Sequence, residues 1–185
     1  MARPLDHAKR AEILDAVVRY IAEQGLADLS LRPLAAALGT SSRMLIYYFG
    51  TKEELLVQAL ATQRPDLTAV FAEAADADAL RERLWQFWRS NTTGPGAVSV
   101  KVMLQVVGAA CASHSPYAAY ADEAIAVFVA TLAAGLRGLE SVDDPEVVAT
   151  LLVSGLRGIL QDRLITGEVE RTDRAARRLI DQTIV

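Results

Sequence analysis

The 185-residue sequence contains few side chains of the kinds that perform catalysis. Its two histidines are His7 and His114, its only cysteine is Cys111, and no Glu-x-x-His pair is present. Catalysis needs acid–base, nucleophilic or metal-binding groups that converge on one site. A single cysteine also excludes an internal disulfide and a cysteine-based zinc site. We therefore expect no enzyme activity, no cofactor and no metal, and we expect Cys111 to be a small buried hydrophobe.

Residues 30–54, SLRPLAAALGTSSRMLIYYFGTKEE, have the pattern of two short helices joined by a tight turn. The leucines of the first helix share one face, and Gly39 follows where the backbone must take a positive φ. Ser41 can cap a second helix, whose inward residues would be Leu45 and Phe49. Such a pair is typical of the helix-turn-helix, whose second helix enters the major groove of DNA. The alternative is an ordinary helical hairpin.

A further helix is expected to begin after Thr51, because Thr51 and Glu54 have the spacing of a capping box. Its N-terminus combines free backbone N–H groups and a positive dipole with the side chain of Lys52, which suits one phosphate group. Pro65 is expected to end or kink this helix.

The remaining sequence has helical periodicity and no strand-like alternation. Helices are expected over residues 7–24, 78–91, 97–113, 116–139, 144–166 and 172–184, with Thr172 as the cap of the last one. These elements predict an all-α fold of about nine helices. We expect a three-helix helix-turn-helix domain over residues 1–51 and a helical body over residues 52–185.

Composition and charge limit the class of protein further. Hydrophobic residues make up 52% of the chain, which argues against disorder. We expect no membrane span and no signal peptide, and hence a cytoplasmic protein. Residues 1–64 hold eight Lys or Arg and seven Asp or Glu, whereas residues 65–185 hold 11 and 16. A near-neutral head on an acidic body suits a DNA-binding protein that contacts few phosphates.

The stretch LGTSSRMLIYYFGTKEELL resembles the tetracycline-repressor (TetR) family of bacterial transcription regulators. The resemblance covers about residues 8–60 and consists of an ordered set: Gly25, Leu34, Ala35, Leu38, Gly39, Ser41, Leu45, Tyr48, Phe49 and residues 50–55. It implies a homodimer that binds a palindromic operator in double-stranded DNA, with recognition helices about 34–36 Å apart. It also implies that the body binds a small-molecule effector.

The resemblance assigns the DNA contacts residue by residue. Ser42, Arg43 and Ile46 would face base edges; Thr40, Ser41, Met44, Tyr47, Tyr48 and Lys52 would lie near the sugar–phosphate backbone; Arg32 would reach a phosphate or base from the preceding helix. Arg43 is the strongest candidate, because its guanidinium can bond O6 and N7 of guanine together. The family commonly has a tyrosine at the position of Ile46. Ile46 either packs on a thymine methyl group or turns inward.

The body offers candidates for ligand binding and for dimerisation. The ligand candidates are Trp85, Trp88, Met103, Gln105, His114 and Tyr117, and the alternative for each is packing or solvation. The dimerisation candidates are Leu152, Gly155, Leu156, Ile159 and Leu179. Glycine inside a helix costs up to about 1 kcal/mol, so Gly155 and Gly158 suggest the close approach of a partner helix. The alternative is that these helices pack only within the monomer.

The leading hypothesis is a repressor that an apolar or amphipathic ligand releases from its operator. The ligand would bind within residues 65–185 and displace the helix that begins at Lys52, which would change the separation of the two recognition helices. A second hypothesis is a ligand-independent regulator whose body only dimerises or recruits a partner. A third is a helical enzyme or lipid carrier, for which the sequence offers no catalytic set.

Overall fold

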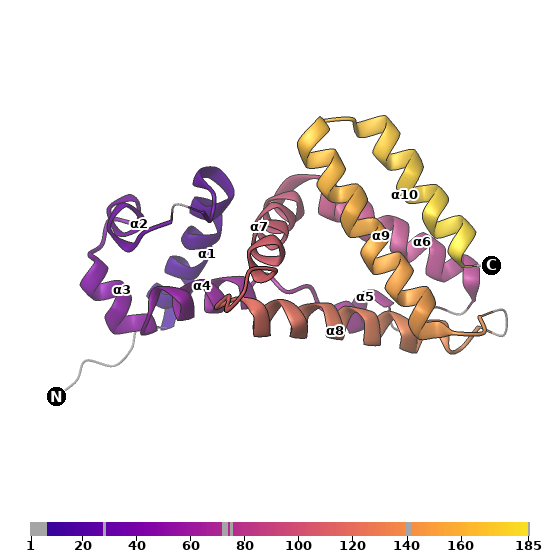
Figure 1. Cartoon of the computed structure of the whole chain (residues 1–185), viewed down its shortest axis with the longest axis horizontal. Coiled ribbons are helices and arrows are strands. Elements are labelled where there is room, and N and C mark those ends of the chain that lie inside the picture. The colour runs from indigo at the N-terminus through magenta and orange to yellow at the C-terminus, as the bar shows by residue number, and fades with distance from the viewer. Residues whose placement is uncertain (1–6, 28, 72–73, 75, 140–141, 185) are drawn as a thin grey trace. The chain divides into compact units, whose positions relative to one another are not determined.

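A computed structural model of the chain describes residues 7–27, 29–71, 74, 76–139 and 142–184. Every regular element within these residues is a helix (Figure 1), which confirms the all-α prediction. The helices are α1 (His7–Gln24), α2 (Leu31–Ala37), α3 (Ser42–Phe49), α4 (Lys52–Ala61), α5 (Leu67–Phe71), α6 (Ala77–Thr92), α7 (Gly94–Ala110), α8 (Ala118–Leu136), α9 (Pro145–Thr166) and α10 (Val169–Thr183). Pro65 lies between α4 and α5, so it kinks neither helix.

The chain forms two compact units. The first contains residues 1–64 and 98–121, and the second contains residues 65–97 and 122–185. This division differs from the expected boundary after residue 51, because α4 packs with α1 and α3. The reason is burial: the apolar face of α4 lies in the same core as α1 and comprises Leu55, Leu56, Ala59 and Leu60. The later part of α7 joins this core through Val102 and Val106.

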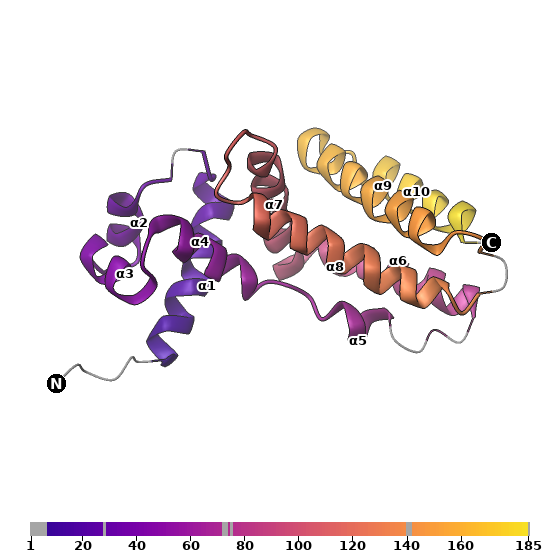
Figure 2. The same cartoon turned by 60° about the horizontal axis from the view of Figure 1, so that its bottom comes forward.

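The second unit consists of α5, α6, most of α8, and the pair α9 and α10. Figures 1 and 2 show α9 and α10 side by side, and Gly167 makes the turn between them with a φ of +72°. The core includes Leu80, Leu84, Trp88, Leu132, Leu136, Leu152 and Ile180. Helix α10 begins at Val169 rather than at the expected cap, Thr172, which is fully buried and donates to the Glu168 carbonyl at 2.7 Å.

Helix α8 has the length and apolarity of a membrane span, with a mean hydropathy of 1.5. The expectation that no segment has this character is therefore wrong by length and composition. A core helix of a globular protein passes the same test. One side of α8 does contribute to the core of the second unit, through Leu132, Ala133 and Leu136.

Candidate nucleic-acid interface

The turn between α2 and α3 has the geometry that its sequence predicts. Gly39 has a φ of +63°, and a Cβ atom there would meet nothing within 4 Å, so backbone conformation alone favours glycine. The Thr40 amide donates to the Ala35 carbonyl at 2.9 Å and thereby closes α2. The Ser41 hydroxyl accepts from the Met44 amide at 3.2 Å and caps α3. These two ends fix the direction in which α3 leaves the turn.

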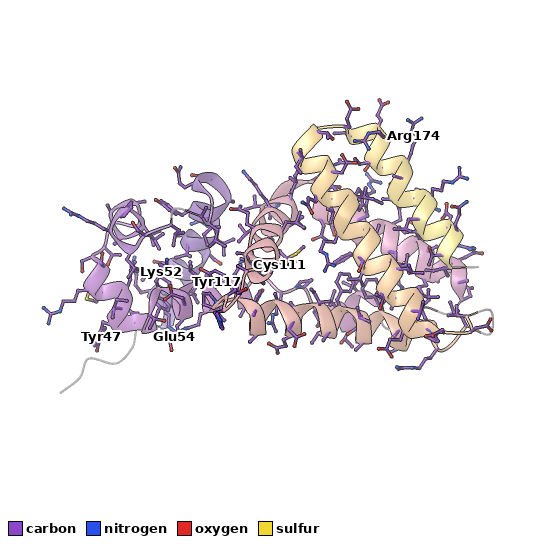
Figure 3. All side chains as sticks on the ribbon, in the orientation of Figure 1. Tyr47, Lys52, Glu54, Cys111, Tyr117 and Arg174 are labelled. Atoms are coloured by element: carbon purple, nitrogen blue, oxygen red, sulfur yellow. The ribbon has the colours of Figure 1, made fainter. Side chains whose placement is uncertain are left out.

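Helix α3 is anchored by one face and exposed on the other. Leu45 and Phe49 are buried in the first core, as predicted. Met44, Ile46 and Tyr47 are 39%, 43% and 60% exposed, and Figure 3 shows Tyr47 on the outer side of the helix. The alternative in which Ile46 turns inward is therefore wrong. Of the other expected DNA-contacting residues, Arg32, Ser41 and Arg43 are exposed, whereas Thr40, Ser42, Tyr48 and Lys52 are half-buried.

Two residues hold the C-terminal end of α3 against α1 and α4. Arg10 of α1 donates to the Gln58 side chain of α4, and its guanidinium lies 5.3 Å from the centre of the Phe49 ring. The Gln58 amide in turn donates to the Phe49 carbonyl at 3.3 Å. No local pattern reveals the role of Arg10, because its partners lie far away in the sequence.

The start of α4 forms the predicted capping box. The Glu54 amide donates to Thr51 Oγ1 at 3.1 Å, and the Thr51 amide donates to Glu54 Oε2 at 2.7 Å. Lys52 Nζ donates to the Leu29 carbonyl at 3.2 Å and lies 3.7 Å from Glu53 Oε1. A phosphate at this helix end would share Lys52 with those two groups and would lie beside two carboxylates. Figure 3 shows Lys52 and Glu54 at this end.

Polar and ring contacts hold the segment 98–121 against residues of the first unit that precede it in the chain. Gln105 Oε1 accepts from the Leu26 amide at 2.8 Å, just after the end of α1. Ser99 Oγ donates to Gln63 Oε1 at 2.8 Å. The Arg64 guanidinium lies 4.5 Å from the centre of the Tyr120 ring. Gln105, an expected ligand contact, therefore holds the end of α1 instead of standing unpartnered.

Tyr117 is also part of the first unit, where it is buried against the same core. Burial raises the pKa of its hydroxyl above the ordinary value of 10.0, and the negative charge of Glu53 raises it further. The neutral phenol is thus favoured by the fold. His114 and Cys111 are both exposed in the connection after α7 (Cys111 is labelled in Figure 3), so the expectation of a buried cysteine is wrong. Met103 is half-buried on α7.

The two expected tryptophans belong to the second unit, whereas Gln105 and Tyr117 belong to the first. Trp88 is buried and donates from Nε1 to Asp173 Oδ1 at 2.8 Å. Trp85 is half-buried with the Arg177 guanidinium 5.6 Å from its ring centre. The six ligand candidates are therefore divided between the two units.

Three phenylalanine rings, none of them among the six ligand candidates, form an aromatic cluster in the second unit. The rings of Phe71, Phe87 and Phe128 lie 5.4–5.9 Å from one another, centre to centre. Phe87 and Phe128 are half-buried. No local pattern in the sequence brings these rings together, because they come from three separate helices. Among the described residues, no group of three or more His, Cys, Asp or Glu is placed to hold a metal ion.

Most of the expected dimerisation residues are used within the chain. Leu152 and Leu156 are buried in the second core, and Ile159 and Leu179 pack against it. A Cβ atom on Gly155 would lie 2.5 Å from Leu179 Cδ2, so this glycine lets α10 of the same chain approach α9. The alternative of packing within the monomer therefore holds for these residues. The outer face of α9 presents a different set: Val147, Leu151, Ser154, Gly158 and Ile165.

Comparison with known proteins identifies the N-terminal helices most clearly. Residues 13–59 match the sequence model for bacterial regulatory proteins of the tetR family. The HTH-type transcriptional regulator BetI of Burkholderia thailandensis is 37% identical over 78 residues, which are 41% of this chain and 40% of that protein. The chain thus matches about two fifths of the length of this curated relative.

Solved structures resemble the chain over nearly its whole length. A transcriptional regulator from Rhodococcus sp. Rha1 is 25% identical with a TM-score of 0.78, and the match covers 94% of this chain and 95% of that one. The multidrug binding protein EbrR, solved in complex with proflavin, is 27% identical with a TM-score of 0.62. That match covers 92% of this chain and 99% of EbrR. The likeness therefore extends to the helical body.

Proposed function

Because the chain belongs to the tetR family of bacterial regulatory proteins, we propose that it is a cytoplasmic transcriptional repressor that binds operator DNA as a homodimer. The observation that carries the proposal is that α3 has one buried face and one exposed face. Leu45 and Phe49 anchor one face in the core, while Arg43 and Ile46 stand exposed on the other. A short helix held in this way after a capped turn suits insertion into a major groove.

The proposed contacts follow from this placement. Arg43 bonds a guanine through its fork of donors, and Ser42 lies beside it as a less selective reader. The remaining residues position the helix on the sugar–phosphate backbone: Arg32, Thr40, Ser41, Met44, Tyr47, Tyr48 and Lys52. Such contacts fix register and supply salt-dependent affinity, but they carry no sequence information.

We further propose that a small apolar or amphipathic ligand regulates DNA binding from the second unit. The half-buried rings of Phe87 and Phe128, which pack with the buried ring of Phe71, offer aromatic surface for such a ligand. EbrR, the relative solved with proflavin, supports this class of ligand. A ligand shifts the protein only if it binds the DNA-free geometry more tightly than the DNA-bound one. Displacement of α4 would reach α3 directly, because Gln58 of α4 bonds the Phe49 carbonyl.

The homodimer is proposed to form through the outer face of α9. Val147, Leu151 and Ile165 are 52%, 55% and 75% exposed there. A Cβ atom on Gly158 would meet nothing within 4 Å, which leaves room for a partner helix. Exposed apolar side chains in one row on a helix are typical of protein–protein contacts.

The test is a fluorescence anisotropy titration on the DNA upstream of the protein's own gene at moderate salt. Replacing Arg43 by alanine should weaken binding by about 5- to 150-fold per half-site, which is the range for one bidentate contact with guanine. Arg89→Ala is the matched control, because it removes the same charge from an exposed position on α6 of the second unit. Equal binding by the wild-type protein and the Arg43 variant, or no binding by either, would refute the proposal.

A further inference from the structure

Ile46 is an exposed apolar side chain in the row of residues that would face the bases. It lies four residues after Ser42 and three after Arg43, so these three side chains share one face of α3. On a helix of 3.6 residues per turn, Ile46 falls between the other two. It is 43% exposed, whereas its neighbour Leu45 is 1% exposed.

The packing of α3 keeps Ile46 exposed, because burying this side chain would disrupt other contacts of the helix. Turning α3 enough to bury Ile46 would move Leu45 and Phe49 out of the first core. The helix is also held at its start by the Ser41 cap and at its end by Gln58 on the Phe49 carbonyl. The branched side chain of isoleucine is restricted at χ1 and so presents its methyl groups in a defined direction.

The chemistry of the groove then selects a partner for Ile46. The side chain can neither donate nor accept a hydrogen bond, so it cannot read the N–H and C=O groups of the base edges. The apolar group that the major groove presents is the C5-methyl of thymine. Cytosine has a hydrogen at the same ring position and acquires an equivalent methyl when it is methylated at C5.

We propose that Ile46 reads a pyrimidine 5-methyl group in each half-site, next to the base that Arg43 contacts. The proposal rests on the proposed function, in which α3 enters the major groove. Ile46 would therefore recognise the methyl group of the pyrimidine and not its hydrogen-bonding groups. The protein should therefore accept thymine and 5-methylcytosine at this position and discriminate against uracil and unmodified cytosine.

The probe is a duplex selected by the full-length wild-type protein from a random DNA library. Each thymine in its half-sites is replaced in turn by deoxyuridine, which deletes the methyl group and leaves the base pair intact. At one position per half-site, we expect binding to weaken by about fourfold for each half-site, which corresponds to burial of one methyl group. At that same position, 5-methylcytosine paired with guanine should bind more tightly than cytosine paired with guanine by a similar factor.

The variant Ile46→Ala should bind the thymine and deoxyuridine duplexes equally. Met44→Ala is the matched control, because it shortens another exposed apolar side chain of α3 and should preserve the ratio between the two duplexes. Circular dichroism of both variants should match the wild type, since neither side chain is buried.

The outcomes separate this proposal from the proposed function. If the duplex is bound in an Arg43-dependent way but deoxyuridine has no effect at any position, the methyl reading is refuted and the DNA-binding function stands. The same conclusion follows if Ile46→Ala retains the full preference for thymine. If the selection enriches no duplex, the proposed function and this proposal both fail.

Discussion

Replacement of Arg163 by methionine should destabilise the second unit, because this side chain joins α9 to α10 and α6. Arg163 Nη1 donates to Asp173 Oδ1 at 2.7 Å and also lies 3.1 Å from Thr172 Oγ1 and 3.2 Å from the Val169 carbonyl. The same Asp173 oxygen accepts from Trp88 Nε1 at 2.8 Å. The guanidinium carbon lies 5.9 Å from the centre of a Trp88 ring. The three helices thus share one polar contact.

The expected magnitude follows from the burial of the pair. The side chain of Arg163 is 14% exposed and that of Asp173 is 37% exposed. Removing one partner of a fully buried ion pair costs about 3–5 kcal/mol, whereas an exposed pair contributes about 1 kcal/mol or less. Since this pair lies between those limits, we expect a loss of about 2 kcal/mol. In a chain of this size, that loss lowers Tm by about 4–8 °C.

The assay is urea unfolding followed by far-UV circular dichroism and tryptophan fluorescence. All variants are compared at one protein concentration, because the midpoint of a dimer depends on concentration. Arg174→Met is the matched control, since it removes the same charge from an exposed position on α10 (labelled in Figure 3) and should change stability by less than about 0.5 kcal/mol. Asp173→Asn completes a double-mutant cycle with Arg163→Met.

Two results would refute this reasoning. Equal stabilities for Arg163→Met and Arg174→Met would show that the position of Arg163 contributes nothing. Additive effects of Arg163→Met and Asp173→Asn would show that the two side chains do not interact.

Three further predictions concern other contacts. Because the pKa of Tyr117 is raised, its neutral form stabilises the fold fully below about pH 10, and this contribution is lost as pH rises through the folded-state pKa. Tyr117→Phe should abolish that alkaline loss of stability in denaturant titrations between about pH 8 and about pH 11. A pH profile of stability that is unchanged in the variant would contradict this prediction. Gln105→Leu removes the acceptor of the Leu26 amide, so unfolding free energy should fall by about 1 kcal/mol and hydrogen exchange of that amide should accelerate; an unaltered exchange rate would count against the contact. Leu151→Glu should yield a folded monomer in sedimentation experiments, and a persistent dimer would exclude the outer face of α9 as the interface.

Local signals predicted the helices well because each depends on residues within about one turn. The Ser41 cap and the Thr51–Glu54 capping box both form as the sequence indicates. The start of α10 was missed for the converse reason. Thr172 has the chemistry of a cap, but it is buried within α10, which begins directly after the Gly167 turn.

Side-chain partners were not predictable from the sequence where they lie far apart in the chain. Gln105 has the ordinary appearance of a polar residue in an apolar helix, and its partner is the amide of Leu26. Arg10 lies near the start of α1, and its partners, Phe49 and Gln58, lie about 40 to 50 residues further along the chain. Gly155 suggested close approach either by a partner chain or within the monomer, and Leu179 of the same chain fills the space beside it.

The sequence by itself determined the all-α fold and the pair of short helices joined at Gly39, because caps and apolar periodicity are local. The interpretation of this pair as a helix-turn-helix with Arg43 facing DNA came from the family resemblance. Only the tertiary structure decided which residues share a core and which remain available to partners. Burial of Leu45 and Phe49 against other helices leaves Ile46 exposed, and packing of α10 on α9 leaves Leu151 and Gly158 on the outer face. Those outcomes depend on contacts between distant segments, which no local pattern specifies.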